Sequence, residues 1–125
     1  MEQITLAKIE DTDAFENIQE IAKCFAEKLK PLKIFLFGSY ATGKASKDSD
    51  YDFYIVVDDE RNVSEVSTQA YRAIRHIRKR PVDIVVGTKG RFEKYGNSKD
   101  SLFVEGEVAR TGKLIYDDGD HDQKG

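Results

Sequence analysis

Two aspartates stand where the sequence could bind a metal ion. Asp50 and Asp52 lie one residue apart at the start of an apolar run, residues 53–57, that has the composition of a buried strand. Side chains two residues apart in a strand point to the same face, so the two carboxylates should project together. Neighbouring carboxylates raise each other's pKa unless a cation lies between them. The pair therefore predicts a site for a hard divalent cation such as magnesium, which prefers carboxylate oxygens.

A glycine–serine turn supplies the second chemical feature. Gly38 and Ser39 directly follow another apolar run, residues 34–37, that should form a strand. Ser39 is expected to act as the N-cap of a short helix, and the exposed N–H groups of a helix start favour phosphate oxygens. Gly38 has no Cβ, so a ligand could approach its backbone closely. This turn and the two aspartates together predict a site for a metal-bound nucleoside triphosphate.

A third aspartate, Asp83, lies inside the apolar run of residues 82–86. A charged side chain in such a strand is costly unless it is paired or bound to metal. The alternative is a strand-end aspartate that simply faces water. Because the Asp50 and Asp52 pair is already present, we favour Asp83 as a third member of the metal site.

The rest of the chain is expected to build a small α/β (α+β) domain that positions these residues. Apolar runs predict the strands of a mixed β-sheet at residues 32–37, 51–57, 82–86 and, as a candidate fourth, 113–116. Helical spacing of apolar residues predicts two longer helices packed on the sheet, between residues 13 and 29 and between residues 62 and 77. Two shorter helices are expected, one around Phe92 and Tyr95 and one from about residue 100 to 110.

Length and composition narrow the class of protein. At 125 residues the chain fits one domain, expected over residues 1–116, and the acidic residues 117–125 are expected to form a disordered tail. A net charge of −3 argues against broad binding of nucleic-acid backbones. The single cysteine, Cys24, fits a reducing compartment, and no signal peptide or membrane-spanning run is present. We therefore expect a cytoplasmic protein without membrane contact.

One basic segment departs from this acidic balance. Its ionisable residues are Arg72, Arg75, His76, Arg78, Lys79 and Arg80. The simpler interpretation is a solvated face whose cations complement the C-terminal end of a helix dipole. The alternative is a patch for phosphate or for an acidic partner, because the segment ends just before the strand that carries Asp83. The sequence leaves both interpretations open.

The spacing of the candidate residues resembles the signature of a known family. Gly38 and Ser39 are followed, after ten residues, by the pair Asp50 and Asp52, and Asp83 matches a third aspartate on a later strand. This pattern resembles that of the polymerase-beta-like nucleotidyltransferase superfamily. More closely, it resembles the minimal nucleotidyltransferases, or MNT proteins, which are commonly antitoxins encoded beside a HEPN-type ribonuclease toxin.

The resemblance implies a role for each of these residues. Asp50 and Asp52 would be catalytic ligands of magnesium, with two ions expected, and Asp83 would complete the metal site near the attacking hydroxyl. Gly38 and Ser39 would hold the β- and γ-phosphates of ATP or of another nucleoside triphosphate.

The sequence departs from the family pattern at one position. The family usually carries a basic residue where this chain has Thr42. Lys44 could supply the missing charge and is our third candidate for nucleotide binding, although a solvated loop lysine is an equally good interpretation.

The function implied by the resemblance is metal-dependent transfer of AMP from ATP to a hydroxyl. The expected acceptor is a tyrosine of a partner HEPN-type toxin, which the transfer would silence. Larger relatives carry an extra helical domain for which this chain has no residues. The acceptor side is therefore expected from a partner protein or from a second copy in a homo-oligomer.

Two other functions remain open at this stage. One is a catalytically idle antitoxin that works by binding and occlusion. The other is a transferase for a small molecule of the aminoglycoside type, with its pocket built across a homodimer. An enzyme acting on nucleic acid is disfavoured by the acidic composition and by the lack of a stretch that mixes aromatic and basic residues.

Overall fold

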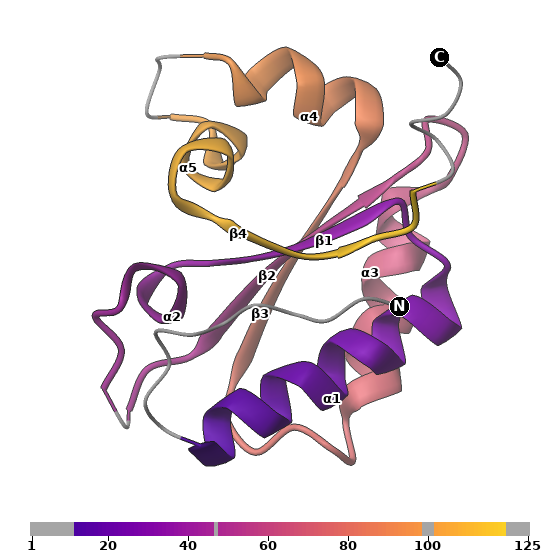
Figure 1. Ribbon diagram of the computed structural model, residues 1–125. Coiled ribbons are helices and arrows are strands. Elements are labelled where there is room, and N and C mark those ends of the chain that lie inside the picture. The colour runs from indigo at the N-terminus through magenta and orange to yellow at the C-terminus, as the bar shows by residue number, and fades with distance from the viewer. Residues whose placement is uncertain (1–11, 47, 99–101, 120–125) are drawn as a thin grey trace.

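A four-stranded mixed sheet lies between two layers of helices (Figure 1). The computed structural model describes residues 12–46, 48–98 and 102–119. The strands, in the spatial order β3-β2-β1-β4, are β1 (Lys33–Phe37), β2 (Tyr51–Val57), β3 (Val82–Thr88) and β4 (Lys113–Asp117). Strand β1 pairs antiparallel with β2 and with β4, whereas β2 and β3 run parallel. The predicted fold class, a small mixed sheet with packed helices, is confirmed.

Helices α1 (Thr12–Leu29) and α3 (Val63–Ile74) cover one face of the sheet (Figure 1). Strand β2 contributes every second residue to the core beneath them. These fully buried side chains are Tyr51, Phe53, Ile55 and Val57. The rings of Phe25 on α1 and Phe53 on β2 meet edge to face, with centroids 5.4 Å apart. The strand period of two therefore leaves the alternate residues, including Asp52, for the opposite face.

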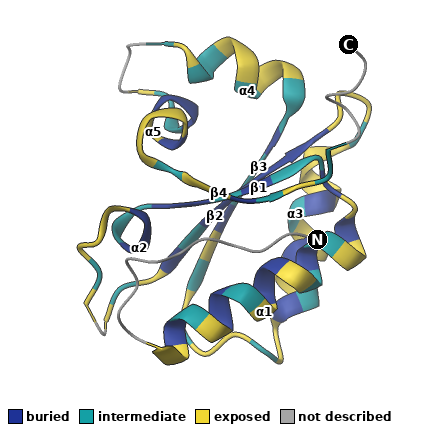
Figure 2. Cartoon of the chain, viewed as in Figure 1, coloured by how far each residue is buried: buried dark blue, intermediate teal, exposed yellow. Residues whose placement is uncertain are grey.

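Helices α4 (Lys89–Gly96) and α5 (Val104–Thr111) lie over that opposite face. Their core is smaller: Val108 of α5 is buried against Phe37, Tyr54 and Val56 of the sheet. Figure 2 shows the sheet mostly buried, whereas much of α4 is exposed. This second layer therefore needs anchors beyond apolar packing.

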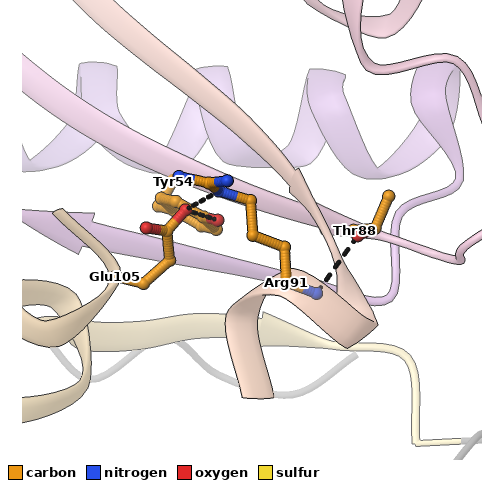
Figure 3. Close-up of polar contacts among 4 residues, drawn as sticks. All are labelled: Tyr54, Thr88, Arg91 and Glu105. Atoms are coloured by element: carbon orange, nitrogen blue, oxygen red, sulfur yellow. Dashed lines mark hydrogen bonds and ion pairs between the residues drawn. The ribbon is translucent and has the colours of Figure 1, made fainter. Parts of the chain in front are cut away.

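A buried polar contact supplies such an anchor (Figure 3). The hydroxyl of Tyr54 donates to Oε2 of Glu105 at 2.6 Å, and Nε of Arg91 donates to the same oxygen at 2.8 Å. Burial alone would raise the pKa of Glu105, but these two hydrogen bonds, a backbone hydrogen bond and the charge of Arg91 together hold the pKa below its usual range. Glu105 therefore joins β2, α4 and α5 as a charged carboxylate.

Gly87 of β3 leaves room for this contact. A Cβ at Gly87 would overlap the hydroxyl oxygen of Tyr54. Only glycine lets the tyrosine side chain cross the neighbouring strand to reach Glu105.

Replacing Tyr54 by phenylalanine should lower the free energy of unfolding by about 1–3 kcal/mol, because buried Glu105 then loses a donor. Chemical denaturation at neutral pH measures this change. Tyr71→Phe is the matched control, because the hydroxyl of Tyr71 lies on an exposed residue and accepts one backbone hydrogen bond. Equal effects of the two substitutions would contradict the assigned role of the Tyr54 hydroxyl.

Several expected boundaries differ from the structure, among them the end of α3 and the end of β3. Helix α3 ends at Ile74, three residues early, because the buried side chain of Asn17 holds the following turn. Its Nδ2 donates to the carbonyl of Ile77 at 2.8 Å, and its Oδ1 accepts from the amide of Lys79 at 2.8 Å. Strand β3 continues two residues further than predicted, to Thr88.

The predicted tail begins on the sheet. Asp117 is the last residue of β4, and the amide of Asp118 donates to the carbonyl of Leu32 at 3.1 Å. Residues 120–125 of that tail, and residues 99–101 before α5, lie outside the described residues. Among the helices that the structure does describe, none is long and apolar enough to cross a membrane.

Candidate active site

Three strand ends meet at one end of the sheet and carry the candidate residues. The parallel register pairs Asp52 of β2 directly with Asp83 of β3. The antiparallel register pairs Asp52 with Phe37, the last residue of β1, and Gly38 follows at once. The sheet topology thus places residues 38, 52 and 83 side by side, although 45 residues of sequence separate the first from the last.

The carboxyl group of Asp52 lies against the backbone of Gly38. A Cβ at Gly38 would overlap Oδ2 of Asp52 and would lie 3.0 Å from its Cγ. Gly38 also has φ +76° and ψ −154°, a conformation that is essentially restricted to glycine. Conformation and close approach therefore both require glycine at this position.

The electrostatic environment of Asp52 is strongly negative. Burial and then the charges of Asp83, Asp50 and Glu107 raise the pKa of Asp52 from 3.8 to about 6. A hydrogen bond that protonated Asp52 donates to Asp83 raises it further. Such an excess of carboxylates at one point is typical of sites that bind divalent cations.

The donor set fits a hard cation. Asp52 and Asp83 offer only carboxylate oxygens, and the parallel register of β2 and β3 makes them direct neighbours. Asp50 precedes β2, is exposed, and acts on Asp52 through its charge. Within the described residues, no group of three or more acidic, histidine or cysteine side chains forms a ready-made metal cluster. The structure thus places Asp52 and Asp83 opposite each other on neighbouring strands, and the charge of Asp50 also acts on Asp52.

The stability of the metal-free protein should depend on whether the carboxyl group of Asp52 is protonated. The folded state raises the pKa of this group, so it binds more protons than the unfolded state between pH 4 and 6. The free energy of unfolding should therefore fall as the pH rises through this window and level off above it. Denaturation in EDTA across this range measures the effect, with Asp52→Asn as the control that lacks it. If the free energy of unfolding depends on pH in the same way in the wild type and in Asp52→Asn, the negative environment assigned to Asp52 is contradicted.

The short helix α2 (Ser39–Thr42) begins one residue earlier than the N-cap prediction required. Ser39 is its first residue, and Gly38 occupies the N-cap position without a side-chain hydrogen bond. The carbonyl of Gly38 accepts from the amides of Ala41 and Thr42, at 3.0 and 3.2 Å. The prediction of Ser39 as the N-cap is wrong, because the unusual backbone of Gly38 already makes the turn into the helix.

Lys44 lies in the exposed loop after α2. Gly43 ends the helix in the left-handed conformation, and the amide of Lys44 donates to the carbonyl of Ser39 at 3.0 Å. No hydrogen bond or ion pair within the described part of the chain joins the Lys44 side chain to the three aspartates. Its role in nucleotide binding stays a prediction.

Glu107 on α5 is a site neighbour that the sequence did not indicate. Its charge contributes to the raised pKa of Asp52, although 55 residues of sequence separate the two. The adjacent Val108, buried against Phe37 and Tyr54, holds this part of α5 on the sheet. No motif or spacing marks Glu107, because only the packing of α5 brings it near the aspartates.

Comparison with known proteins identifies the family of this chain. The family model of the nucleotidyltransferase domain matches residues 18–108, so the chain belongs to this family. No functionally curated protein matches the chain. The predicted resemblance to the nucleotidyltransferases is confirmed by this match.

Several solved structures share the fold. A candidate nucleotidyltransferase from Sulfolobus solfataricus is 22% identical with a TM-score of 0.58, covering 84% of this chain and 81% of its own. A toxin–antitoxin structure with AMP-PNP is 20% identical with a TM-score of 0.53, and the match covers 85% of this chain and 78% of the other. A mutant of the toxin–antitoxin MntA-HpeT is 22% identical with a TM-score of 0.52, and the match covers 86% of this chain and 77% of the other. At these identities the likeness shows the fold.

Proposed function

We propose that this protein transfers AMP from ATP to a hydroxyl group, and that the acceptor is a tyrosine of a HEPN-type toxin for which it is the antitoxin. One observation carries the proposal: in a nucleotidyltransferase domain, Asp52 is paired with Asp83 on the next strand and its carboxyl group lies against the backbone of Gly38. Toxin–antitoxin complexes, one of them with AMP-PNP, are among the solved structures of the same fold, which supports the choice of partner.

Each candidate residue has a defined task in this reaction. Asp50 and Asp52 would hold magnesium, and two ions, when bound, would neutralise charge on the entering and leaving oxygens. A carboxylate oxygen of Asp83 would orient the attacking hydroxyl and accept its proton. Gly38, with no side chain, and Ser39 would hold the β- and γ-phosphates. The chemistry would then depend on positioning and on neutralising negative charge.

The exposure of the site supports a protein acceptor. Asp83 is exposed on β3, an edge strand, so a hydroxyl on another protein can reach it from outside the domain. A cavity of about 290 Å³ lies at the other end of the sheet, where Lys33 pairs with Val56. A small-molecule acceptor bound in that cavity would be far from the aspartates along the strands.

The test is the intact mass of the protein encoded beside this chain, after incubation with the chain, ATP and magnesium. We expect a gain of one or more nucleoside monophosphates, and a partner whose acceptor tyrosine is replaced by phenylalanine should show none. Parallel reactions with GTP, CTP and UTP identify the preferred base. A tight complex without any mass gain would favour an antitoxin that acts by occlusion and would overturn the proposal.

Replacing Thr42 by arginine should strengthen binding of Mg–ATP about three- to tenfold, because an exposed charge–phosphate contact contributes about 1 kcal/mol. Thr42 is exposed at the end of α2, so the longer side chain fits without repacking. Isothermal titration calorimetry measures the affinity, and Thr42→Gln controls for side-chain size. Equal affinities of the arginine and glutamine variants would contradict a phosphate site at α2.

A further inference from the structure

The turn from α3 into β3 concentrates positive charge on a chain that is otherwise acidic. Between Val66 and Val82 there is no acidic residue, and five are arginine or lysine. Because the net charge of the whole chain is −3, the remainder carries −8. We call this group the basic turn; its members are Arg72, Arg75, Arg78, Lys79 and Arg80. All except half-buried Arg80 are exposed.

The backbone of the basic turn is fixed in place. Asn17, which is 1% exposed, holds both Ile77 and Lys79 through its carboxamide. Nη1 of Arg78 donates to the carbonyl of Arg80 at 3.3 Å. These hydrogen bonds fix the backbone from which the cations of the turn extend.

The basic turn lies beside the candidate active site. The hydroxyl of Tyr71 accepts a hydrogen bond from the amide of Ile84, the residue after Asp83, at 3.0 Å. Tyr71 is 43% exposed, and Arg75 follows it by one helical turn. Tyr71 therefore reaches the open edge of β3 next to Asp83, although α3 itself covers the face of the sheet opposite to the one that carries Asp52.

Four of the five cations in the basic turn are available to a partner. Within the described residues, no carboxylate forms an ion pair with Arg72, Arg75, Arg78 or Lys79. Exposed arginine next to exposed tyrosine is the composition of protein-binding hot spots. A nucleic acid fits less well, because the neighbouring aspartates and the acidic remainder of the chain would repel its phosphates.

We infer that the basic turn and Tyr71 dock an acidic segment of the protein that carries the acceptor hydroxyl, and so determine which hydroxyl reaches Asp83. This inference rests on the proposed function for the identity of the site. The site is open because β3 is an edge strand. Charge complementarity at the basic turn would therefore help to select the partner.

The inference is tested by binding of labelled copolymers, measured by fluorescence anisotropy. A copolymer of glutamate and tyrosine should bind the full chain more tightly than a copolymer of lysine and tyrosine or poly(U). Arg72→Glu with Arg75→Glu should weaken its binding about tenfold or more. The double variant Lys23→Glu with Lys28→Glu, which makes the same charge change on exposed positions of α1, should bind as the wild type does.

Three results would overturn the inference: no preference for the acidic copolymer, equal binding by the two double variants, or tighter binding of poly(U). A matching loss of Mg–ATP affinity in the Arg72 and Arg75 variant would also overturn it, because the surface would then bind the triphosphate. If the glutamate variant does not fold, the corresponding glutamine variant should still weaken binding about threefold. Copolymer binding needs no nucleotide transfer, so failure of the proposed reaction stays distinguishable from failure of this docking.

Discussion

Replacing Asp52 by asparagine should abolish nucleotidyl transfer and leave the domain folded. Asparagine keeps the size of the side chain, so the close approach to Gly38 is preserved. It removes the carboxylate that contacts Asp83 and that is expected to hold magnesium. Loss of such a charge should lower the rate by at least about a thousandfold, the upper range for removing one electrostatic group that stabilises a transition state.

The same substitution should not weaken the metal-free fold. Asp52 is destabilised by burial and by three neighbouring carboxylates, and a neutral amide relieves both effects. We therefore expect the free energy of unfolding of Asp52→Asn at neutral pH to equal or exceed that of the wild type in EDTA. A folded variant that retains transfer activity would refute the role assigned to Asp52.

Replacing Gly38 by alanine should lower both activity and stability. The backbone at φ +76° and ψ −154° should cost about 1–3 kcal/mol with a side chain present. The new Cβ would also overlap Oδ2 of Asp52 and force that carboxyl away from its position. A displacement of about 1 Å in a catalytic group can cost about a hundredfold in rate, so we expect a loss of this size.

Gly43→Ala separates these two effects. Gly43 also has a positive φ, of +81°, but nothing lies within 4 Å of the position that its Cβ would take. This control should therefore lose some stability to backbone strain and keep most of its transfer activity. Denaturation and initial rates of both variants give the comparison. Similar rate losses in the two would show that strain, rather than the contact with Asp52, explains the effect of Gly38→Ala.

Local patterns were sufficient to predict the sheet and the strands that carry Asp52 and Asp83. The alternation along residues 51–57 divides β2 between core and site, as its fully buried odd-numbered residues confirm. The register of β2 with β3 then follows from pairing two apolar runs, and it brings Asp52 beside Asp83. Metal binding by these aspartates and phosphate binding by Gly38 and Ser39 stay predictions.

The features that the sequence did not indicate all depend on contacts between distant segments. Asn17 ends α3 early by bonding to Ile77, a contact across 60 residues. Glu105 bonds to Tyr54 across 51 residues, and this contact helps to fix the helix that carries Glu107. No local propensity records such pairings, because each polar side chain alone would be assigned to solvent.

Calorimetric titration with an ATP analogue that cannot be transferred tests most directly whether the aspartates bind nucleotide through metal. We predict binding in magnesium, no binding in EDTA, and no binding by Asp52→Asn in either buffer. Equal affinity with and without magnesium, or binding by Asp52→Asn as tight as that of the wild type, would contradict the account.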